Sequence, residues 1–206
     1  MALVMLMRHG EAENNVQHIV AGRTSEYHLT ENGKIQVRRT AEKLKDLSID
    51  AIYTSPVIRT VETSQIVSET IGIDYTVDER LTETEMGSLV GMHINEVLEK
   101  FDDLFLKFYY NDDVLSKVGL EGFSSIGSRM NSMLDYVGEK HHDKNVLLVT
   151  HLDPIKAAIS RIMDLKPEVL FNMTIKNASL TILKHSSKDY TLSAFNVMDI
   201  SRYTFE

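Results

Sequence analysis

Residues 2–11 read ALVMLMRHGE: six consecutive apolar residues followed directly by Arg8 and His9. A short apolar run without polar alternation is typical of a strand that is buried on both faces, as in a parallel sheet. The run differs from a signal peptide because no basic residue precedes it and no small-residue cleavage site follows it. We therefore predict a buried strand over Ala2–Met7 that ends at an arginine and a histidine.

Outward from this strand, short apolar runs alternate with helical patterns along the chain. We expect further strands over Ala51–Thr54 and Val146–Thr150, and a closing pair over Ser179–Leu183 and Tyr190–Val197. We expect helices over Asn32–Leu47, Pro56–Ile71, Ser124–Lys140 and Pro154–Leu165. Strand and helix alternation of this kind predicts an α/β sandwich with a mostly parallel sheet.

The middle of the chain follows a different pattern, with helical stretches such as Ile94–Phe108 and a polar turn at Asn111. This segment, at about residues 87–122, is expected to be a lid inserted into the sheet domain. The sequence has no internal repeat, low-complexity tract or Gly/Ser/Pro-rich linker. We therefore expect residues 1–206 to form a single domain that carries this lid.

Composition excludes several classes of function. The 206 residues include no cysteine, which excludes a disulfide framework, an iron–sulfur cluster and a thiol nucleophile. The net charge of −8 offers no general attraction to nucleic acid or to an anionic membrane. No segment approaches the ~18 uninterrupted apolar residues that a membrane span requires. We expect a cytoplasmic protein that binds neither nucleic acid nor membrane, in which an anionic substrate would need a local basic pocket.

Two prolines mark the turns from strand to helix. Pro56 and Pro154 each follow an expected strand and occupy the expected first helical position, after Ser55 and Asp153 as capping residues. In open α/β sheets, ligands bind beyond the carboxyl ends of the strands, where helix amino termini offer free N–H groups. The chemistry of this chain is therefore expected at that edge.

Polar side chains suited to phosphate follow three of the expected strands. Arg8 and His9 follow the first strand, and His151 follows Val146–Thr150. Arg59 lies in the helix that follows the strand Ala51–Thr54. Arginine offers a planar fork for phosphate, and histidine offers an uncharged nitrogen nucleophile. Gly10 is expected to let the backbone approach a ligand closely. One histidine at a strand end is more often a satisfied surface residue than a catalyst, but the recurrence at equivalent positions favours a site.

Five motifs then follow one another in order along nearly the whole chain. They are Arg8-His9-Gly10-Glu11 with Asn15; Gly22-Arg23 before Leu29-Thr30-x-x-Gly33; Ser55-Pro56-x-x-Arg59-Thr60-x-x-Thr63; Leu81-x-Glu83-x-x-x-Gly87; and Val149-Thr150-His151. Together they resemble the histidine phosphatase superfamily, also called phosphoglycerate-mutase-like. The resemblance implies a three-layer α/β/α sandwich with a mostly parallel central sheet and a helical lid insertion. It also implies metal-independent phosphoryl transfer through a phosphohistidine, on a small phosphorylated substrate.

The resemblance assigns a role to each matching residue. His9 would be the nucleophile that attacks phosphorus, and Glu83 would be the general acid that protonates the leaving oxygen. Arg8, Arg59 and His151 would bind the equatorial phosphoryl oxygens. Phosphoryl transfer asks mainly for in-line positioning and preorganised positive charge, which these residue types supply.

Further residues are expected around this centre. Asn15 and the backbone of Leu152 would assist in binding phosphate, and Arg23 would border the pocket. Glu85 is the alternative general acid, since it lies two residues after Glu83, whereas Glu11 is expected to support its loop by accepting backbone hydrogen bonds. The run His141-His142-Asp143 is interpreted as a solvated turn and not as a metal site.

The sequence departs from the family pattern in two places. Leu152 stands where many members have glycine, and Lys156 either approaches the site or pairs with Asp153. True phosphoglycerate mutases resemble one another in an Arg-His-Tyr after the acid and an arginine pair in the insertion, whereas here residues 84–86 are Thr-Glu-Met and residues 88–120 have no arginine. The distal end of the substrate is therefore expected to be neutral, apolar or cationic, in contact with Leu89, Phe108 and Tyr109.

Three functions follow from these observations. The leading hypothesis is hydrolysis of a small phosphomonoester by an enzyme of the histidine acid phosphatase type, without a cofactor. The alternative is a phosphoglycerate mutase dependent on 2,3-bisphosphoglycerate, with Arg23 and Lys156 as candidates for the carboxylate contact. The third is a non-catalytic phosphate-binding regulatory domain. The sequence names neither the leaving group nor the assembly state, and a homodimer is one option.

Overall fold

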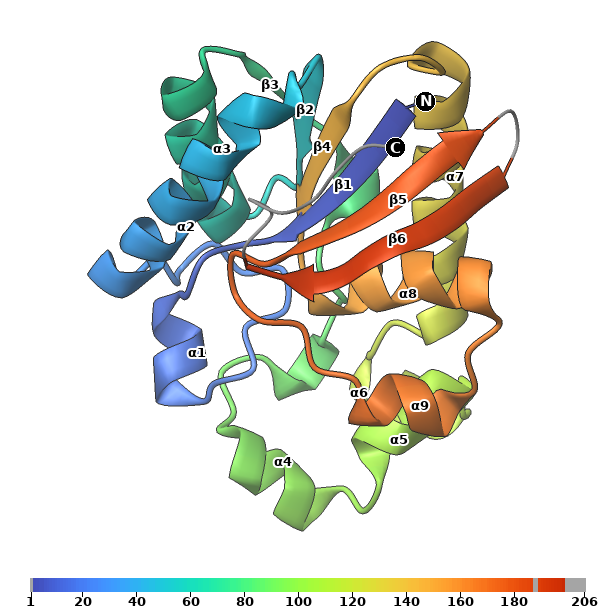
Figure 1. Cartoon of the computed structure of the whole chain (residues 1–206). Helices are drawn as coiled ribbons and strands as arrows, with labels where there is room; N and C mark the ends of the chain where they lie inside the picture. The colour runs from blue at the N-terminus through green and yellow to red at the C-terminus, as the bar shows by residue number, and fades with distance from the viewer. Residues whose placement is uncertain (1, 187–188, 199–206) are drawn as a thin grey trace.

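A computed structural model describes residues 2–186 and 189–198 of the chain, which form one mixed sheet with helices on both faces (Figure 1). The strands are β1 (Ala2–Arg8), β2 (Ala51–Thr54), β3 (Tyr75–Val77), β4 (Val146–Thr150), β5 (Leu180–Ser186) and β6 (Asp189–Val197). Their order across the sheet is β3-β2-β4-β1-β5-β6. Strands β1 to β4 run parallel, β5 is antiparallel to β1, and β6 is antiparallel to β5. The expected mostly parallel sheet with a closing strand pair is confirmed.

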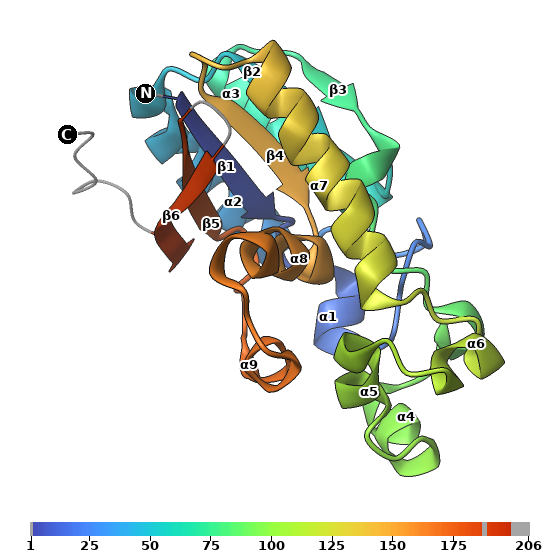
Figure 2. The same ribbon diagram turned by 90° about the vertical axis from the view of Figure 1, so that its right-hand side faces the viewer.

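The uninterrupted apolar sequence of β1 reflects burial on both faces. Leu3 and Met5 pack in one cluster with residues of α2 (Glu31–Leu44) and with Val67 of α3 (Ile58–Ile71). Val4 and Leu6 pack in the opposite cluster with residues of α7 (Phe123–Lys140) and α8 (Leu152–Met163). Full burial of one such side chain contributes about 1.5–3 kcal/mol. Figure 2 shows the resulting three layers, with α7 and α8 on one side of the sheet and α2 and α3 on the other.

The remaining elements lie mostly beyond the carboxyl ends of the central strands, below the sheet in Figures 1 and 2. They are α1 (Glu13–Gln17), η1 (Lys45–Leu47), η2 (Glu79–Leu81), η3 (Gly87–Leu89), α4 (Ile94–Lys100), α5 (Leu104–Tyr110), α6 (Val114–Val118) and α9 (Pro167–Asn172). We call residues 87–122, which hold η3, α4, α5 and α6, the insertion. The expected continuous helix over Ile94–Phe108 is wrong, because Asp103 adopts a left-handed conformation (φ +54°) that separates α4 from α5.

The two proline-marked helices begin elsewhere than expected. Helix α3 begins at Ile58 with Val57 as N-cap, and α8 begins at Leu152 with His151 as N-cap, which places Pro154 third in the helix. Asp153 therefore lies inside α8 and caps nothing. Its carboxylate accepts hydrogen bonds from other elements, so the expected capping role is replaced by contacts near the site.

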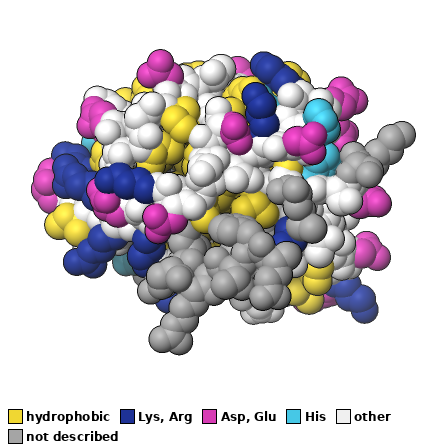
Figure 3. Space-filling view, turned by 45° about the horizontal axis from the view of Figure 1, so that its top comes forward, with side chains coloured by type: hydrophobic (Ala, Val, Ile, Leu, Met, Phe, Trp, Pro, Cys, Tyr) yellow, Lys and Arg dark blue, Asp and Glu magenta, His cyan; other side chains and the backbone are white. Residues whose placement is uncertain are grey.

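The surface agrees with the charge balance of the sequence. On the face shown in Figure 3, Lys and Arg side chains are mixed with Asp and Glu side chains, without a large area of one sign. Among the described residues, no helix is both long and apolar enough to cross a bilayer. The cytoplasmic location and the homodimer stay predictions.

Candidate active site

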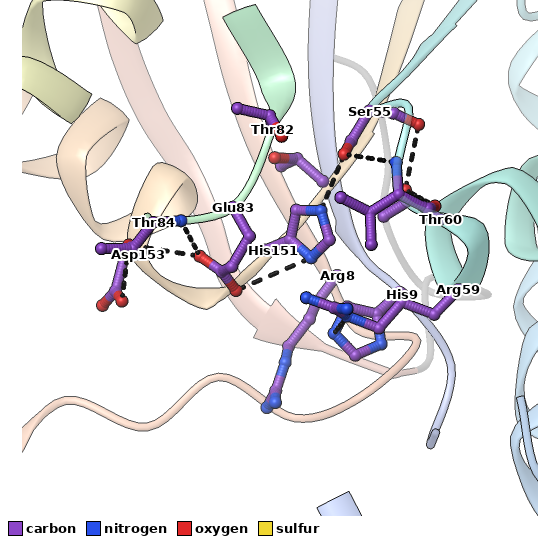
Figure 4. Close-up of polar contacts among 12 residues, drawn as sticks. Arg8, His9, Ser55, Arg59, Thr60, Thr82, Glu83, Thr84, His151 and Asp153 are labelled. Carbon is purple, nitrogen blue, oxygen red and sulfur yellow. Dashed lines mark hydrogen bonds and ion pairs between the residues drawn. The ribbon is translucent and has the colours of Figure 1, made fainter. Parts of the chain in front are cut away.

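A cavity of about 340 Å³ opens at the carboxyl edge of the sheet. Arg8, His9, Arg59 and Glu83 all contribute to its lining. Parallel strands β1 and β4 place His9 and His151 at the same edge, and Figure 4 shows these side chains gathered together. The expected convergence of the motifs at one end of the sheet is therefore present in the structure.

His9 directly follows β1 and has only 2 % of its surface exposed. Its Nδ1 lies 2.7 Å from the carbonyl oxygen of Gly10, an acceptor that assigns the ring proton to Nδ1. The lone pair is then on Nε2, to which Arg59 Nε donates at 3.3 Å. Burial, followed by the charges of Arg59 and Arg8, holds the pKa of His9 well below its usual value. His9 is therefore a neutral imidazole at neutral pH, with a nucleophilic nitrogen at Nε2.

The guanidinium groups of Arg8 and Arg59 supply positive charge beside His9. Arg59 lies in the first turn of α3, is 2 % exposed, and donates to the carbonyl oxygen of Gly22 at 2.8 Å. Arg8 donates to the carbonyl oxygen of Ile175, while its buried Nε has no partner among the described residues. Burial lowers the pKa of both groups, that of Arg59 to about 10, so both stay charged at neutral pH.

His151 follows β4 and is fully buried, with its ring centroid 5.3 Å from that of His9. Its Nε2 lies 2.8 Å from the hydroxyl oxygen of Ser55, which also accepts the N–H of Val57 at 3.3 Å. A Ser55 hydroxyl that donates to Nε2 places the ring proton of His151 on Nδ1, which is the tautomer we propose. Burial, followed by the charge of Arg59, holds the pKa of His151 well below its usual value. A neutral His151 of this tautomer directs its Nδ1–H toward Glu83, while His151 itself does not line the cavity.

Glu83 lies just after η2, and its carboxylate points toward His151 (Figure 4). Its Oε2 lies 3.6 Å from His151 Nδ1, and its Oε1 accepts the N–H of Thr84 at 2.9 Å. Burial, followed by the negative charge of Asp153, raises the pKa of Glu83 to about 7. At neutral pH a large fraction of Glu83 therefore carries the proton that a general acid must donate.

Arg23 supports Glu83 through the backbone and does not line the cavity. Its Nε donates to the carbonyl oxygen of Glu83 at 2.9 Å, and its terminal nitrogen donates to Glu121 at 2.8 Å. Arg129 of α7, which the sequence analysis did not single out, donates to the same carbonyl oxygen at 3.3 Å and to that of Thr82. These two arginines fix the backbone that carries the acid.

Asn15 and Leu152 both line the cavity, as the expected phosphate contacts should. The Oδ1 of Asn15 accepts from the backbone of Ala12 at 3.0 Å and from the side chain of Asn177 at 3.1 Å. Leu152 is the first residue of α8, a position whose N–H has no partner within the helix. Asn177 also donates to the carbonyl oxygen of His9 at 3.2 Å, a contact that no local sequence pattern indicated.

The alternative acids lie outside the cavity. Glu85 is half-exposed, and its carboxylate accepts the N–H of Gly87 at 3.1 Å. Glu11 does support its loop, but its carboxylate accepts from the side chains of Thr30 at 2.6 Å and Asn32 at 3.1 Å and not from backbone groups. Of the acids considered, Glu83 is the one that faces His151.

Gly10 is in close contact with α2. A Cβ at this position would lie 2.7 Å from the carbonyl oxygen of Gly33 and 2.7 Å from a methyl group of Val37. Its N–H donates to the hydroxyl oxygen of Thr63 at 3.1 Å. Glycine is therefore required because α2 packs against the loop after β1, and the approach of a ligand to this backbone stays a prediction.

The rest of the cavity wall is mainly apolar. It includes Val20, Met86, Ile94, Phe105, Phe108 and Phe171. Tyr109 also lines the cavity, as expected, but Leu89 is fully buried in the core and does not. The expectation for Leu89 is wrong because η3 turns its side chain into the cluster beneath the insertion.

The histidines next to β4 do not form a metal site. His141 Nε2 lies 2.9 Å from the hydroxyl of Tyr53, and the exposed His142 pairs with Asp143 at 2.7 Å. Within residues 2–186 and 189–198, no three His, Asp or Glu side chains gather as metal ligands.

Comparison with known proteins identifies the family. The family model of the histidine phosphatase superfamily, branch 1, matches residues 4–198. The chain belongs to this superfamily. This histidine phosphatase is 31 % identical to a 2,3-bisphosphoglycerate-dependent phosphoglycerate mutase of Thermoplasma acidophilum, over 98 % of this chain and 97 % of that protein. It is 30 % identical to putative phosphoserine phosphatase 2 of Hydrogenobacter thermophilus, over 95 % of this chain and 96 % of that protein.

A solved structure shares the fold of this histidine phosphatase. A mutant phosphoserine phosphatase of Entamoeba histolytica in complex with phosphoserine aligns with a TM-score of 0.82 at 24 % identity, over 96 % of this chain and 98 % of that chain. The superfamily consists of phosphatases and mutases that transfer phosphoryl groups through a histidine without a metal. The chain is therefore an enzyme of phosphoryl transfer, as the resemblance implied.

Proposed function

We propose that this histidine phosphatase hydrolyses small phosphomonoesters through a phosphohistidine formed on His9. The observation that carries the proposal is the neutral Nε2 of His9, which accepts from the buried Arg59 and lies in the same cavity as Glu83 and the partly buried Arg8. The nucleophile, the positive charge and the acid are thus present together without a metal ligand cluster among the described residues.

In the first step, Nε2 of His9 attacks phosphorus while the bond from phosphorus to the ester oxygen breaks. Arg8, Arg59 and the Nδ1–H of His151 donate to the non-bridging oxygens and stabilise their charge. Glu83 gives its proton to the leaving oxygen, so the alcohol departs and a carboxylate remains. The carbonyl oxygen of Gly10 continues to accept the Nδ1–H of His9, whose ring is now positively charged.

In the second step, water attacks the phosphohistidine. The Glu83 carboxylate takes a proton from the water, and the oxygen of that water forms its bond to phosphorus. The bond between phosphorus and Nε2 breaks, which releases inorganic phosphate and restores the neutral His9. Glu83 is then protonated again for the next turnover.

The apolar part of the cavity favours hydrolysis of a phosphomonoester with an uncharged leaving group over isomerisation of phosphoglycerate. A mutase must hold a carboxylate, and a desolvated charge without a partner would cost several kcal/mol, roughly. Arg23 is bonded to Glu121, and Lys156 Nζ donates to the hydroxyl of Tyr109 at 2.8 Å. Neither lines the cavity, and among the described residues Arg8 and Arg59 are the only cationic residues that do. We therefore assign an apolar, uncharged leaving group to the substrate.

The mutase stays the alternative because a phosphoglycerate mutase is among the relatives at 31 % identity. The deciding assay measures phosphate release from alkyl and aryl monoesters, phosphoserine and 3-phosphoglycerate, beside isomerisation of 3-phosphoglycerate with 2,3-bisphosphoglycerate. We expect the highest kcat/KM for the alkyl and aryl monoesters, whose leaving groups carry no charge. Isomerisation tenfold faster than the hydrolysis of every monoester would establish the mutase. If no compound is turned over, the remaining hypothesis is the non-catalytic phosphate-binding domain.

We also propose that the chain is one catalytic domain in which the insertion acts as a lid. Helix α5 contributes Phe105, Phe108 and Tyr109 to the cavity wall, and α4 contributes Ile94. These residues belong to the apolar part of the cavity lining, whose cationic residues are Arg8 and Arg59 among the described residues. The insertion is thereby placed to select the leaving group.

A further inference from the structure

A set of buried polar side chains connects α8 to the carboxyl group of Glu83. Lys156 Nζ donates to the hydroxyl of Tyr109 at 2.8 Å, and that hydroxyl donates to Asp153 Oδ1 at 3.0 Å. The hydroxyl of Thr84 donates to Asp153 Oδ2 at 3.1 Å, and the N–H of Thr84 donates to Glu83 Oε1 at 2.9 Å. We call Thr84, Tyr109, Asp153 and Lys156 the Asp153 cluster.

The Asp153 cluster is buried, although it holds two ionisable side chains of opposite charge. Asp153 is 7 % exposed, Lys156 is 3 % exposed, and Tyr109 is 7 % exposed. Side chains of this kind are rarely buried without a partner, because removing them from water is expensive. The proposed reaction steps use none of these groups, so their burial calls for another role.

The hydrogen bonds distribute charge unequally between Asp153 and Glu83. Asp153 accepts from two hydroxyl groups, and the ammonium of Lys156 is joined to it through Tyr109. Glu83 accepts a backbone N–H at 2.9 Å and only a long contact from the Thr84 hydroxyl at 3.4 Å. Donors and a nearby cation stabilise the ionised form of a carboxyl group. Of the two carboxyl groups, Asp153 is therefore the better place for the negative charge.

We propose that Asp153 is a positioning residue that keeps the proton on Glu83, and that the hydroxyl groups of Thr84 and Tyr109 hold the Asp153 carboxylate in place for this purpose. Thr84 fixes the two carboxyl groups relative to each other. The inference rests on the proposed function, because it concerns the acid of that same reaction. It also gives the insertion a second role, since Tyr109 comes from α5.

The charged groups around Glu83 oppose one another. Arg59 and Arg8 favour its ionised form, as does Lys156, whereas Asp153 disfavours it. His151 faces Glu83 at 3.6 Å but is neutral at neutral pH. Burial raises the pKa of Glu83 most, and Asp153 adds to this effect, so without Asp153 a smaller fraction of Glu83 would carry the proton at neutral pH.

The test is the pH dependence of kcat/KM for an alkyl phosphate, in which the alkaline limb reports the loss of the proton from Glu83 in the free enzyme. Asp153→Asn removes the negative charge, so this limb should move to lower pH by about one pH unit. Lys156→Met removes the opposing positive charge at similar size, while Thr84 and Tyr109 still donate to the Asp153 carboxylate, so the limb should move to higher pH. Asp135→Asn on α7, where Asp135 pairs with Arg161 at 2.8 Å, is the matched control and should leave the limb in place.

Opposite shifts in the two variants separate this role from a structural one, which would lower the rate equally at every pH. A limb that stays in place in folded Asp153→Asn, or that moves in the same direction in both variants, would overturn the inference. If Asp153→Asn does not fold, the upward shift in Lys156→Met decides alone. A wild-type protein that hydrolyses no monoester would instead reject the proposed function.

Discussion

Nδ1 of His151 and Oε2 of Glu83 face each other across 3.6 Å, a distance too long for a hydrogen bond. His151 Nδ1 and Arg8 Nε are both buried without a partner among the described residues. A buried donor left unpaired costs about 1–3 kcal/mol. A phosphoryl group bound as proposed would offer acceptors to both donors, and these hydrogen bonds would contribute to its binding energy.

The nucleophile can be tested directly. His9→Ala should reduce turnover by more than a thousandfold, because no other residue can form the phosphohistidine. Rapid quenching of the wild-type protein with a phosphorus-labelled monoester should trap acid-labile, base-stable phosphate on His9. The trapped label should be absent from His9→Ala. Label on another residue, or activity above a thousandth of wild type, would contradict the role of His9.

Glu83 should show its protonation in the pH profile. Because its pKa is raised to about 7, the protonated acid predominates below pH 7 and is lost as the pH rises above it. The kcat/KM for alkyl phosphates should fall accordingly above pH 7. Glu83→Gln should lose far more activity on alkyl phosphates than on p-nitrophenyl phosphate, whose leaving group needs little protonation. Equal losses on both substrates would remove the assignment and direct attention to Glu85.

Ser55 should act by fixing the tautomer of His151. Ser55→Ala removes the hydroxyl that donates to Nε2, so the ring proton is no longer confined to Nδ1. We expect kcat to fall about 10²-fold, in the range for loss of one oxyanion donor. Nitrogen chemical shifts of His151 measured by NMR should show the altered tautomer. Ser64→Ala, which removes a buried hydroxyl of α3 that has no partner among the described residues, is the control.

Activity should not depend on a metal. Excess EDTA should leave kcat/KM unchanged, and vanadate, which mimics five-coordinate phosphorus, should inhibit by occupying the site. Loss of activity with EDTA that is restored by Mg²⁺ or Zn²⁺ would show that the site has been misinterpreted.

The sequence predicts the central strands and the positions of His9 and His151 for a common physical reason. Strands buried on both faces, such as β1 and β4, are continuous apolar runs, and polar residues directly after them must lie at the sheet edge. His9 and His151 are therefore located by local pattern alone. In contrast, β3 has only three residues, so it carries too little pattern to be recognised.

The surroundings of the centre could not be predicted in the same way. Asp153 has the sequence context of a helix cap, and only the approach of Tyr109 from α5 makes it part of a buried cluster. Asn177 contacts His9 across 168 residues of sequence. Gly10 has the context of a ligand-binding loop, but its close neighbour is the backbone of Gly33. Such contacts depend on tertiary packing, which a single sequence does not reveal.

The last prediction concerns the apolar side chains that line the cavity and are proposed to contact the leaving group. Ile94 lines the cavity at its rim with 37 % of its surface exposed, so a longer side chain can be accommodated there without disturbing the core. Ile94→Arg would place a cation in the half of the cavity where none lines the wall among the described residues. A carboxylate on the substrate would then gain a charge-assisted partner, which is worth about 1.5–3 kcal/mol. We expect kcat/KM for phosphoserine and 3-phosphoglycerate to rise at least tenfold relative to an alkyl phosphate.

Leu98→Arg provides the matched control for this gain. Leu98 lies one turn further along α4, is 53 % exposed and does not line the cavity, so the same charge on the same helix should leave the substrate ratio unchanged. An equal gain in both variants would show a long-range charge effect and not a contact in the cavity. If the wild-type protein already prefers the carboxylate substrates, the apolar leaving group is the wrong assignment. A cation must then reach the cavity when substrate binds, and the candidates Arg23 and Lys156 would have to leave Glu121 and Tyr109 to do so.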